Sequence, residues 1–364
     1  MTKKIAIIHD WLVDFGGAES VLLDIMELYP EADVFTSVNH IEHPKFEGKK
    51  IRTTWIEKIP FLSRRHKLSG FLRHFAFRGL DLHEYDILIS SSSAEAKHIK
   101  KLPHQTHISY CHCITRYYWG RFDEYQNMME FGWLNPIAKI FLKLLISKFR
   151  KWDFEAAQNV DIFIANSRYT QKGIKKFYKK DSLLISPSIP LPIKENPVET
   201  RENYYFAIGR CVPYKRFDLL VDAFNTNGKN IIIATNTDTE LYRELKEKSN
   251  KNIVWKFNPS RQEISSYFSN AKGFLFPQEE DFGIVAIEAL ATGTPIIAYK
   301  KGGSQEIVQE NENGIFFEEA TQKSINNGIE KFEKKKWNYA KIAWGAKKYE
   351  KENFVKKFRK VIEN

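Results

Sequence analysis

Cysteine is scarce in this sequence, since only Cys111, Cys113 and Cys211 occur among 364 residues. Three cysteines do not make a disulfide framework, so we expect a protein of the reducing cytoplasm. Cys111 and Cys113 flank His112, yet no second pair of Cys or His follows at zinc spacing, and no Asp-x-Asp motif occurs. We therefore expect neither a bound metal nor a cofactor.

Long apolar runs are also missing, because none approaches the ~20 residues that a membrane-spanning helix needs. Residues 5–9 are apolar but stop at Asp10, and no small-residue cleavage site follows, so we predict a first strand rather than a signal peptide. Zinc-finger spacing and RNA-binding aromatic motifs are absent, and we expect no nucleic-acid partner. The net charge of +11 instead indicates a nucleotide or an acidic membrane surface.

The composition is that of a globular protein, with 43% hydrophobic and 28% charged residues in a chain long enough for two domains. Short apolar runs, each followed by a loop and a helical pattern, predict doubly wound parallel sheets, an α/β fold. Prolines concentrate in residues 187–197, where we place the linker. The predicted domains are residues 1–190 and 195–340, followed by a C-terminal helix at 341–364.

Residues 273–304 hold the densest group of chemically useful side chains. A short strand ends at Pro277, Glu280 follows at its exit, and Glu288, separated from Glu280 by seven residues, lies about a turn into the next helix. Helix N-termini and glycine loops favour phosphate, whereas carboxylates suit hydroxyl groups. On spacing alone a solvated acidic loop before an ordinary helix would be favoured, but the Gly-Ile-Val run at 283–285 and the glycine pair at 302–303 favour a sugar nucleotide.

Residues 280–289 resemble the paired-glutamate motif of family-4 retaining glycosyltransferases, above all the O-antigen and capsule mannosyltransferases. The resemblance implies a GT-B fold, in which two Rossmann-like domains face a cleft and the last helix returns to the N-terminal domain. The N-terminal domain would then hold the acceptor and the C-terminal domain the nucleotide sugar. Ala286 stands where proline is common in the mannosyltransferases, which weakens the inference of GDP-mannose.

The resemblance also implies which residues bind the donor. Arg210 and Lys215, in a Gly-Arg turn after a strand, would grip the diphosphate, although a basic surface loop is the plainer alternative. Glu280 would hold sugar hydroxyls and Glu288 the ribose. Further donor-binding residues implied by the motifs are Gly16, Gly17, Phe257, Phe282, Gly283, Ile284 and Val285.

His112 follows a predicted strand, at the end of the sheet where ligands bind. A lone histidine among aromatic residues is more often structural, but the family segment has a histidine here that contacts the transferred sugar. The resemblance therefore makes His112 a catalytic candidate together with Glu280, Arg210 and Lys215. Arg116, close behind it, is a candidate for holding an anionic group of the donor or acceptor.

Residues 55–78 form a basic stretch rich in aromatic residues, in which Arg64, Arg65 and Arg73 lie among phenylalanines and leucines. Such a stretch fits an amphipathic helix on an anionic bilayer, and it fits equally a core-packed helix with a solvated basic face. The resemblance implies peripheral attachment to the inner face of the plasma membrane.

The reaction implied by the resemblance is retaining transfer of mannose from GDP-mannose to a polyprenyl-diphosphate-linked or saccharide acceptor, in O-antigen or capsule synthesis. A UDP-sugar-dependent transferase and a sugar-nucleotide epimerase of the same fold are alternatives. A third alternative is a basic protein without catalytic activity that binds membranes or nucleic acid.

Overall fold

The computed structural model describes residues 3–64, 69–120, 135–195 and 197–363. The chain divides into two compact units. The N-terminal unit comprises Met1–Ser186 and Val355–Asn364, and the C-terminal unit comprises Pro187–Phe354. The sequence placed these divisions at residues 190–195 and 341. Helix α14 (Lys351–Glu363) begins in the C-terminal unit and ends in the N-terminal unit.

The N-terminal unit is built on a parallel sheet of seven strands in the order β3-β2-β1-β4-β5-β6-β7. Its central strands β4 and β5 are buried along almost their whole length, as expected where helices cover both faces of a parallel sheet. The elements are β1 (Ile5–His9), α1 (Gly17–Leu28), β2 (Asp33–Thr36), β3 (Ile51–Thr53), α2 (Pro60–Arg64), α3 (Gly70–Arg78), β4 (Ile87–Ser92), β5 (Thr106–Cys111), α5 (Asn135–Gln158), β6 (Ile162–Ala165), α6 (Arg168–Gly173) and β7 (Ser182–Leu184).

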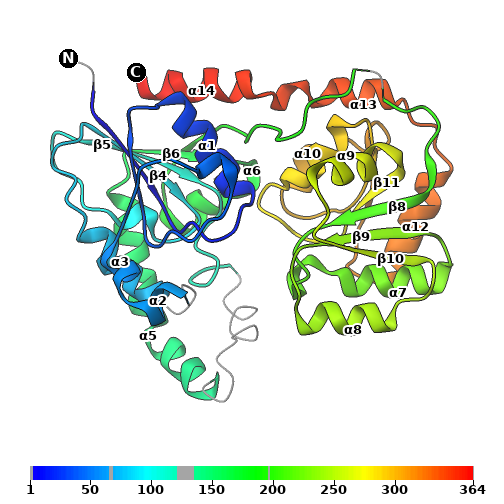
Figure 1. Ribbon diagram of the computed structural model, residues 1–364, viewed down its shortest axis with the longest axis horizontal. Coiled ribbons are helices and arrows are strands. Elements are labelled where there is room, and N and C mark those ends of the chain that lie inside the picture. Colours follow the sequence, from blue (N-terminus) through cyan, green and yellow to red (C-terminus); the bar gives the residue numbers. More distant parts are fainter. Residues whose placement is uncertain (1–2, 65–68, 121–134, 196, 364) are drawn as a thin grey trace. The chain divides into compact units, whose positions relative to one another are not determined.

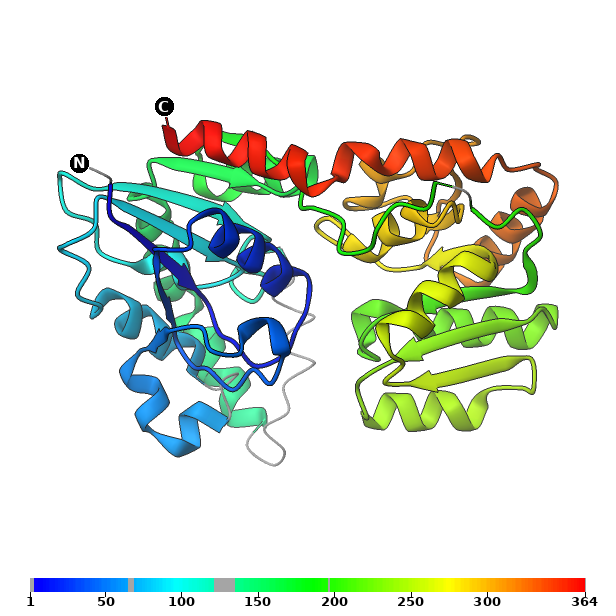
Figure 2. The same cartoon turned by 45° about the horizontal axis from the view of Figure 1, so that its top comes forward.

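The C-terminal unit repeats this plan with six parallel strands in the order β10-β9-β8-β11-β12-β13. Figures 1 and 2 show α7 and α8 on one face of this sheet and α9 and α10 on the other. The elements are β8 (Glu202–Ile208), α7 (Phe217–Asn227), β9 (Ile231–Thr235), α8 (Glu240–Lys248), β10 (Ile253–Phe257), α9 (Arg261–Asn270), β11 (Ala271–Phe276), α10 (Ile284–Ala291), β12 (Ile296–Tyr299), α11 (Ser304–Ile307), β13 (Gly314–Phe317), α12 (Gln322–Glu333) and α13 (Tyr339–Gly345).

The apolar runs of the C-terminal unit form strands because alternate side chains supply two separate cores. On β8, Phe206 packs on one face with Phe274 and Phe276 of β11. Tyr205 of β8 and Leu275 of β11 pack on the opposite face. The uninterrupted apolar sequence is therefore what a strand covered on both sides requires.

The structure differs from the sequence-based predictions in two respects. Strands β3, β7 and β13 were not predicted, and all three are short strands at the edge of a sheet. The basic stretch is not one helix, because its described residues form a short 3-10 helix, η2 (Trp55–Lys58), followed by α2 and α3. Within the described residues, no helix is both long and apolar enough to cross a bilayer.

Candidate functional site

In each sheet the strand order reverses beside the first strand, between β1 and β4 and between β8 and β11. Ligands of doubly wound sheets bind outside the carboxyl ends of the strands at such a reversal. Several of the predicted site residues lie at one or the other of these two places, and the two units are described separately below.

An ion pair between Lys215 and Glu280 occupies the reversal of the C-terminal unit. Lys215 closes a short helix, η7 (Pro213–Lys215), after β8, whereas Glu280 follows β11. Their side chains are only 10% and 16% exposed, so the pair is largely shielded from water. Gln278 Nε2 donates a second hydrogen bond of 3.4 Å to Glu280. The structure therefore brings together two residues that the sequence predicted as site residues.

The backbone of Glu280 is fixed by the loop after β12. Its carbonyl accepts a 2.7 Å hydrogen bond from the Gly303 N–H. Gly302 has φ +71°, and a Cβ at this position would overlap the Glu280 carbonyl oxygen. Glycine is thus required both for the backbone conformation and for the close approach of the two loops.

Glu288 is buried at 4% exposure on α10, and Arg261 Nη1 donates a 3.1 Å hydrogen bond to it. Burial raises the pKa of Glu288, and the nearby Arg261 partly opposes this effect. Arg261 is the first residue of α9, directly after the N-cap Ser260. Arg261 was not predicted as a site residue. Its signal in the sequence is its unusual place, because the first turn of a helix favours carboxylates over cations.

The residues predicted around the start of α10 differ in exposure. Gly283 has φ +105° and lies against the ring of Phe276, and Ile284 and Val285 are half-buried in the first turn. The first N–H groups of a helix have no acceptor within it, so they are available to a ligand. Phe282 is buried, with its ring 5.8 Å from that of Tyr349, so its side chain belongs to the core.

Two predicted donor-binding residues of the C-terminal unit are exposed. Arg210 extends from the end of β8, and its Nη2 donates a 3.2 Å hydrogen bond to the hydroxyl of Tyr214. Phe257 is 51% exposed at the end of β10, with its ring 5.8 Å from that of Tyr242. Both side chains are therefore accessible at the carboxyl edge of the sheet.

His112 lies directly after β5 in the N-terminal unit. Its backbone N–H donates to the Ser92 carbonyl at 2.9 Å, and its own carbonyl accepts a 2.7 Å hydrogen bond from Asn166 Nδ2. Its Nε2 lies 2.8 Å from Ser91 Oγ. Burial, with a smaller contribution from His9, lowers the pKa of His112 to about 3. The ring is therefore neutral at neutral pH.

Two buried residues beside His112 were not predicted as site residues. His9 ends β1, with Nδ1 3.0 Å from Ser91 Oγ and Nε2 3.5 Å from Glu19 Oε1. Glu19 also accepts a 2.9 Å hydrogen bond from the N–H of Gly16, which is exposed, as is Gly17. His9 could have been identified from the sequence, because it is a polar residue at the last position of a central strand and ligands bind at the carboxyl ends of such strands.

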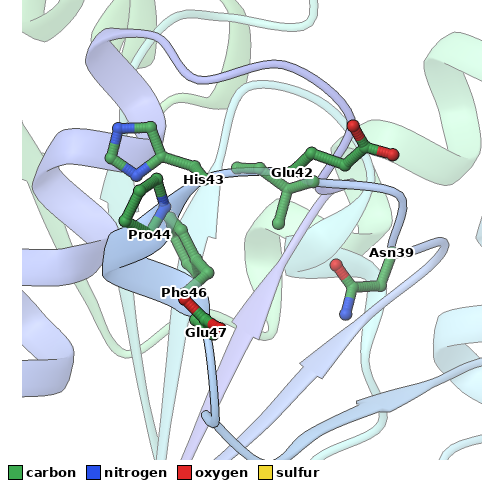
Figure 3. Close-up of a pocket in the computed structure, with 7 residues that line it drawn as sticks. Asn39, Glu42, His43, Pro44, Phe46 and Glu47 are labelled. Carbon is green, nitrogen blue, oxygen red and sulfur yellow. The ribbon is translucent and has the colours of Figure 1, made fainter.

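A cavity of about 350 Å³ lies in the loop after β2. Figure 3 shows the residues that line it, among them Asn39, His43 and Phe46. The ring of Phe15, which precedes the Gly16–Gly17 loop, stacks on His43 at a centroid distance of 3.9 Å. The cavity therefore adjoins the loop that the sequence assigned to ligand binding.

The basic stretch is only partly exposed. Arg64 is exposed, whereas Arg73 is 3% exposed and its Nε donates a 2.8 Å hydrogen bond to Glu95. This placement gives Arg73 a buried ion pair instead of the membrane or acceptor contact that the sequence indicated. Arg116 is half-buried in the turn after His112, and Arg65 lies outside the described residues. No group of three His, Cys, Asp or Glu residues in the described ranges could hold a metal ion.

Comparison with known proteins gives a family match for the C-terminal unit, because residues 188–351 match the family model for Glycosyl transferases group 1. An uncharacterized glycosyltransferase of Methanocaldococcus jannaschii is 28% identical over 179 residues, 48% of this chain and 50% of the relative. The chain thus spans about half the length of curated relatives such as this one.

Two mannosyltransferases are also similar to the chain. The alpha-1,3/1,6-mannosyltransferase alg2 of Schizosaccharomyces pombe is 22% identical over 371 residues, 85% of this chain and 70% of that protein. The O-antigen chain mannosyltransferase RfbU of Salmonella typhimurium is 30% identical over 147 residues, 35% of this chain and 39% of that protein.

Solved structures are similar over the whole chain. Anabaena HepE in complex with UDP and glucose has a TM-score of 0.69 at 16% identity and covers 100% of both chains. Sucrose-phosphate synthase from Thermosynechococcus elongatus has a TM-score of 0.74 at 16% identity, covering 99% of this chain and 98% of that one. This similarity confirms the predicted two-domain α/β fold of the GT-B type.

Proposed function

We propose that this chain, whose residues 188–351 match the glycosyl transferases group 1 family, is a glycosyltransferase that uses a nucleotide-sugar donor. The observation that carries the proposal is the shielded Lys215–Glu280 ion pair at the strand-order reversal of the C-terminal unit. A lysine binds a diphosphate as a point charge, and a carboxylate accepts hydrogen bonds from sugar hydroxyls. A nucleotide sugar carries both a diphosphate and sugar hydroxyls, so it matches the Lys215–Glu280 pair.

In this proposal the chemistry follows from the charge that develops on the departing nucleoside diphosphate. Arg210, Lys215 and the first N–H groups of α10 stabilise that charge. Glu280 holds sugar hydroxyls, Glu288 holds the ribose, and His112 contacts a hydroxyl of the transferred sugar. Side chains and backbone supply the positive charge, so we propose a reaction that is independent of metal and of cofactors.

The finer proposal is retaining transfer of mannose from GDP-mannose to a polyprenyl-diphosphate-linked or saccharide acceptor of O-antigen or capsule synthesis. Its support is the 280–289 motif and the similarity to alg2 and RfbU. A UDP-sugar donor is the second candidate, because Anabaena HepE, with the same fold, has been solved with UDP-glucose.

We also propose that the protein is cytoplasmic and binds peripherally to the anionic inner face of the plasma membrane. The support is a set of exposed, mostly aromatic side chains on η2, α2 and α3 and beside them, which we call the aromatic patch: Trp55, Ile59, Phe61, Phe71 and Phe75 are 37–60% exposed. Lys58 and Arg64 are basic residues of the same segment. Apolar rings beside cations fit the interface of a bilayer that contains anionic lipids.

Calorimetry on the purified chain tests the donor, with GDP, UDP, ADP, GDP-mannose and single-stranded DNA as titrants and no added metal. Tight binding of GDP-mannose that is lost in Arg210→Ala and Glu288→Ala is the expected result. A preference for UDP would keep the transferase and discard mannose. Salt-sensitive DNA binding without nucleotide binding would contradict the enzyme, and donor turnover without any acceptor would indicate an epimerase.

A further inference from the structure

Four side chains of the N-terminal unit form a continuous hydrogen-bonded series, Glu19–His9–Ser91–His112, which we call the histidine chain. His9 and Ser91 are cross-strand partners on β1 and β4, so the sheet itself sets their separation. Glu19, His9 and Ser91 are each at most 8% exposed. Their protons are therefore assigned by one another rather than by water.

The direction of each hydrogen bond follows from the carboxylate at the start of the series. One oxygen of Glu19, Oε2, accepts from the Gly16 N–H at 2.9 Å, which leaves Oε1 facing His9 Nε2 at 3.5 Å. An ionised carboxylate can only accept, so Nε2 of His9 must carry a proton. We take His9 as the neutral imidazole, in which the other nitrogen, Nδ1, is then an acceptor.

The remaining links are then determined. Because His9 Nδ1 accepts, the hydroxyl proton of Ser91 points to it across 3.0 Å. Ser91 Oγ can then only accept from His112 Nε2, which lies at 2.8 Å and so must carry the proton of that neutral ring. Among the described residues, none makes a hydrogen bond to His112 Nδ1, which keeps its lone pair.

We propose that Glu19, acting through His9 and Ser91, fixes His112 as the Nε2–H tautomer and so presents its Nδ1 as a hydrogen-bond acceptor. Glu19, His9 and Ser91 are positioning residues in this scheme. The group that His112 recognises must then be a donor, which a sugar hydroxyl is and a phosphate oxygen is not. That the group belongs to the transferred sugar rests on the proposed function, whereas the tautomer does not.

The substitution Glu19→Gln reverses the direction of the chain without changing its shape. The Gly16 N–H needs an acceptor, so the amide oxygen of the new residue takes the place of Oε2 and the amide NH₂ faces His9 Nε2. His9 Nε2 must then accept, Nδ1 donates to Ser91, and Ser91 donates to His112 Nε2. His112 is left with its proton on Nδ1, as a donor toward the ligand.

The tautomer is measured by ¹⁵N NMR of the full chain labelled with ¹⁵N-histidine, at pH 8, where imidazoles with a pKa of about 6.5 are neutral. The His112 signals are assigned by their loss in His112→Gln. Glu27→Gln, the same change at an exposed position of α1, is the matched control. We expect Nε2–H for wild type and Glu27→Gln, Nδ1–H for Glu19→Gln, and a mixture for Ser91→Ala.

An Nδ1–H tautomer in wild type would overturn the proposal, as would an unchanged tautomer in a Glu19→Gln protein whose Tm matches wild type. If Glu19→Gln does not fold, the tautomers of His112 in wild type and in Ser91→Ala test the proposal instead. In the transfer assay we expect kcat/KM of Glu19→Gln to fall roughly tenfold, since the sugar hydroxyl must then rotate to accept from Nδ1–H and its own proton loses His112 as an acceptor. Absence of transfer with the predicted tautomer would contradict only the proposed function.

Discussion

At the scale of single residues, Lys215 and Glu280 each set the position of the other through their ion pair. Both are largely shielded from water, so loss of either leaves a charge without its partner in a region of low exposure. Because Glu280 holds the Lys215 ammonium group in position, the Lys215 side chain loses less conformational freedom when a diphosphate binds.

We predict that Lys215→Ala weakens the binding of GDP or UDP by about tenfold to a hundredfold, because hydrogen bonds to charged groups contribute about 1.5–3 kcal/mol. Calorimetry measures the Kd. Arg243→Ala is the charge-matched control, since Arg243 is a 66% exposed residue of α8 that pairs with Asp238 at 2.7 Å. An equal loss of affinity in both variants would argue against a role of Lys215 at the diphosphate.

Arg261 is the ion-pair partner of the buried Glu288 and counteracts part of the rise that burial causes in the pKa of Glu288. We predict that Arg261→Ala raises this pKa further, so that Glu288 takes up a proton as the pH falls and no longer accepts from ribose hydroxyls. The nucleotide Kd should then increase between pH 8 and pH 5.5 more steeply than in wild type. Parallel pH curves for Arg261→Ala and wild type would contradict this prediction.

At the scale of elements, the loops after β11 and β12 touch through Glu280 and Gly302. We predict that Gly302→Ala lowers stability and nucleotide affinity together, because the added Cβ pushes the Glu280 backbone out of place. Gly228→Ala is the control, since Gly228 has a similar φ of +68° but open space around it. That variant should lose only about 1 kcal/mol of unfolding free energy to backbone strain and bind normally.

Chemical denaturation and calorimetry on both glycine variants separate the two effects. If Gly302→Ala binds nucleotide as wild type does, the contact between the loops does not position Glu280 for the ligand.

The aromatic patch belongs to three short helical elements and not to the single helix that the sequence indicated. We predict that Phe61→Ser combined with Phe75→Ser reduces co-sedimentation with vesicles of phosphatidylglycerol, because each buried ring contributes about 1.5–3 kcal/mol. Phe61 and Phe75 are 60% and 49% exposed, so folding should be little affected. Trp344→Ser, at a 67% exposed aromatic residue of the C-terminal unit, should sediment as wild type does.

At the scale of the whole molecule, the two units differ in their response to acid. All ten histidines precede residue 113 and so lie in the N-terminal unit. Burial lowers the pKa of His74 to about 4 and that of His107 to about 3. In the unfolded chain these rings take up protons near pH 6.5. Between that pH and the folded-state pKa the unfolded state binds more protons, so acid destabilises the folded N-terminal unit.

We predict that the N-terminal unit loses stability as the pH falls from 7.5 to 5, with about 2 kcal/mol from the fully buried His107 alone at pH 5. Hydrogen exchange, corrected for the intrinsic rate, should show protection falling in β4 and β5 and persisting in β8 and β11. His107→Gln should reduce the loss of unfolding free energy between pH 7.5 and pH 5 by about 2 kcal/mol. Equal losses in both units would contradict the prediction.

Much of the candidate site could be predicted because the family resemblance named residues that follow strands, and the carboxyl ends of neighbouring parallel strands meet at one edge of the sheet. Lys215 and Glu280 are two of these residues, and the structure joins them in an ion pair. Arg261 could not be predicted as the partner of Glu288, because their contact joins positions 27 residues apart on two helices. The edge strands β3 and β7 were missed because a strand of three residues has too short a pattern to detect.

The sequence by itself determined the α/β class, the repetition of the strand–helix unit and the residue types at the strand ends. These properties are local, because apolar runs, glycine turns and helix caps act within a few residues. Only the tertiary structure decided that Arg73 is buried with Glu95, and that Glu19 connects through His9 and Ser91 to His112. Strand order and helix packing bring these side chains together, and they depend on contacts between distant parts of the chain that no local pattern records.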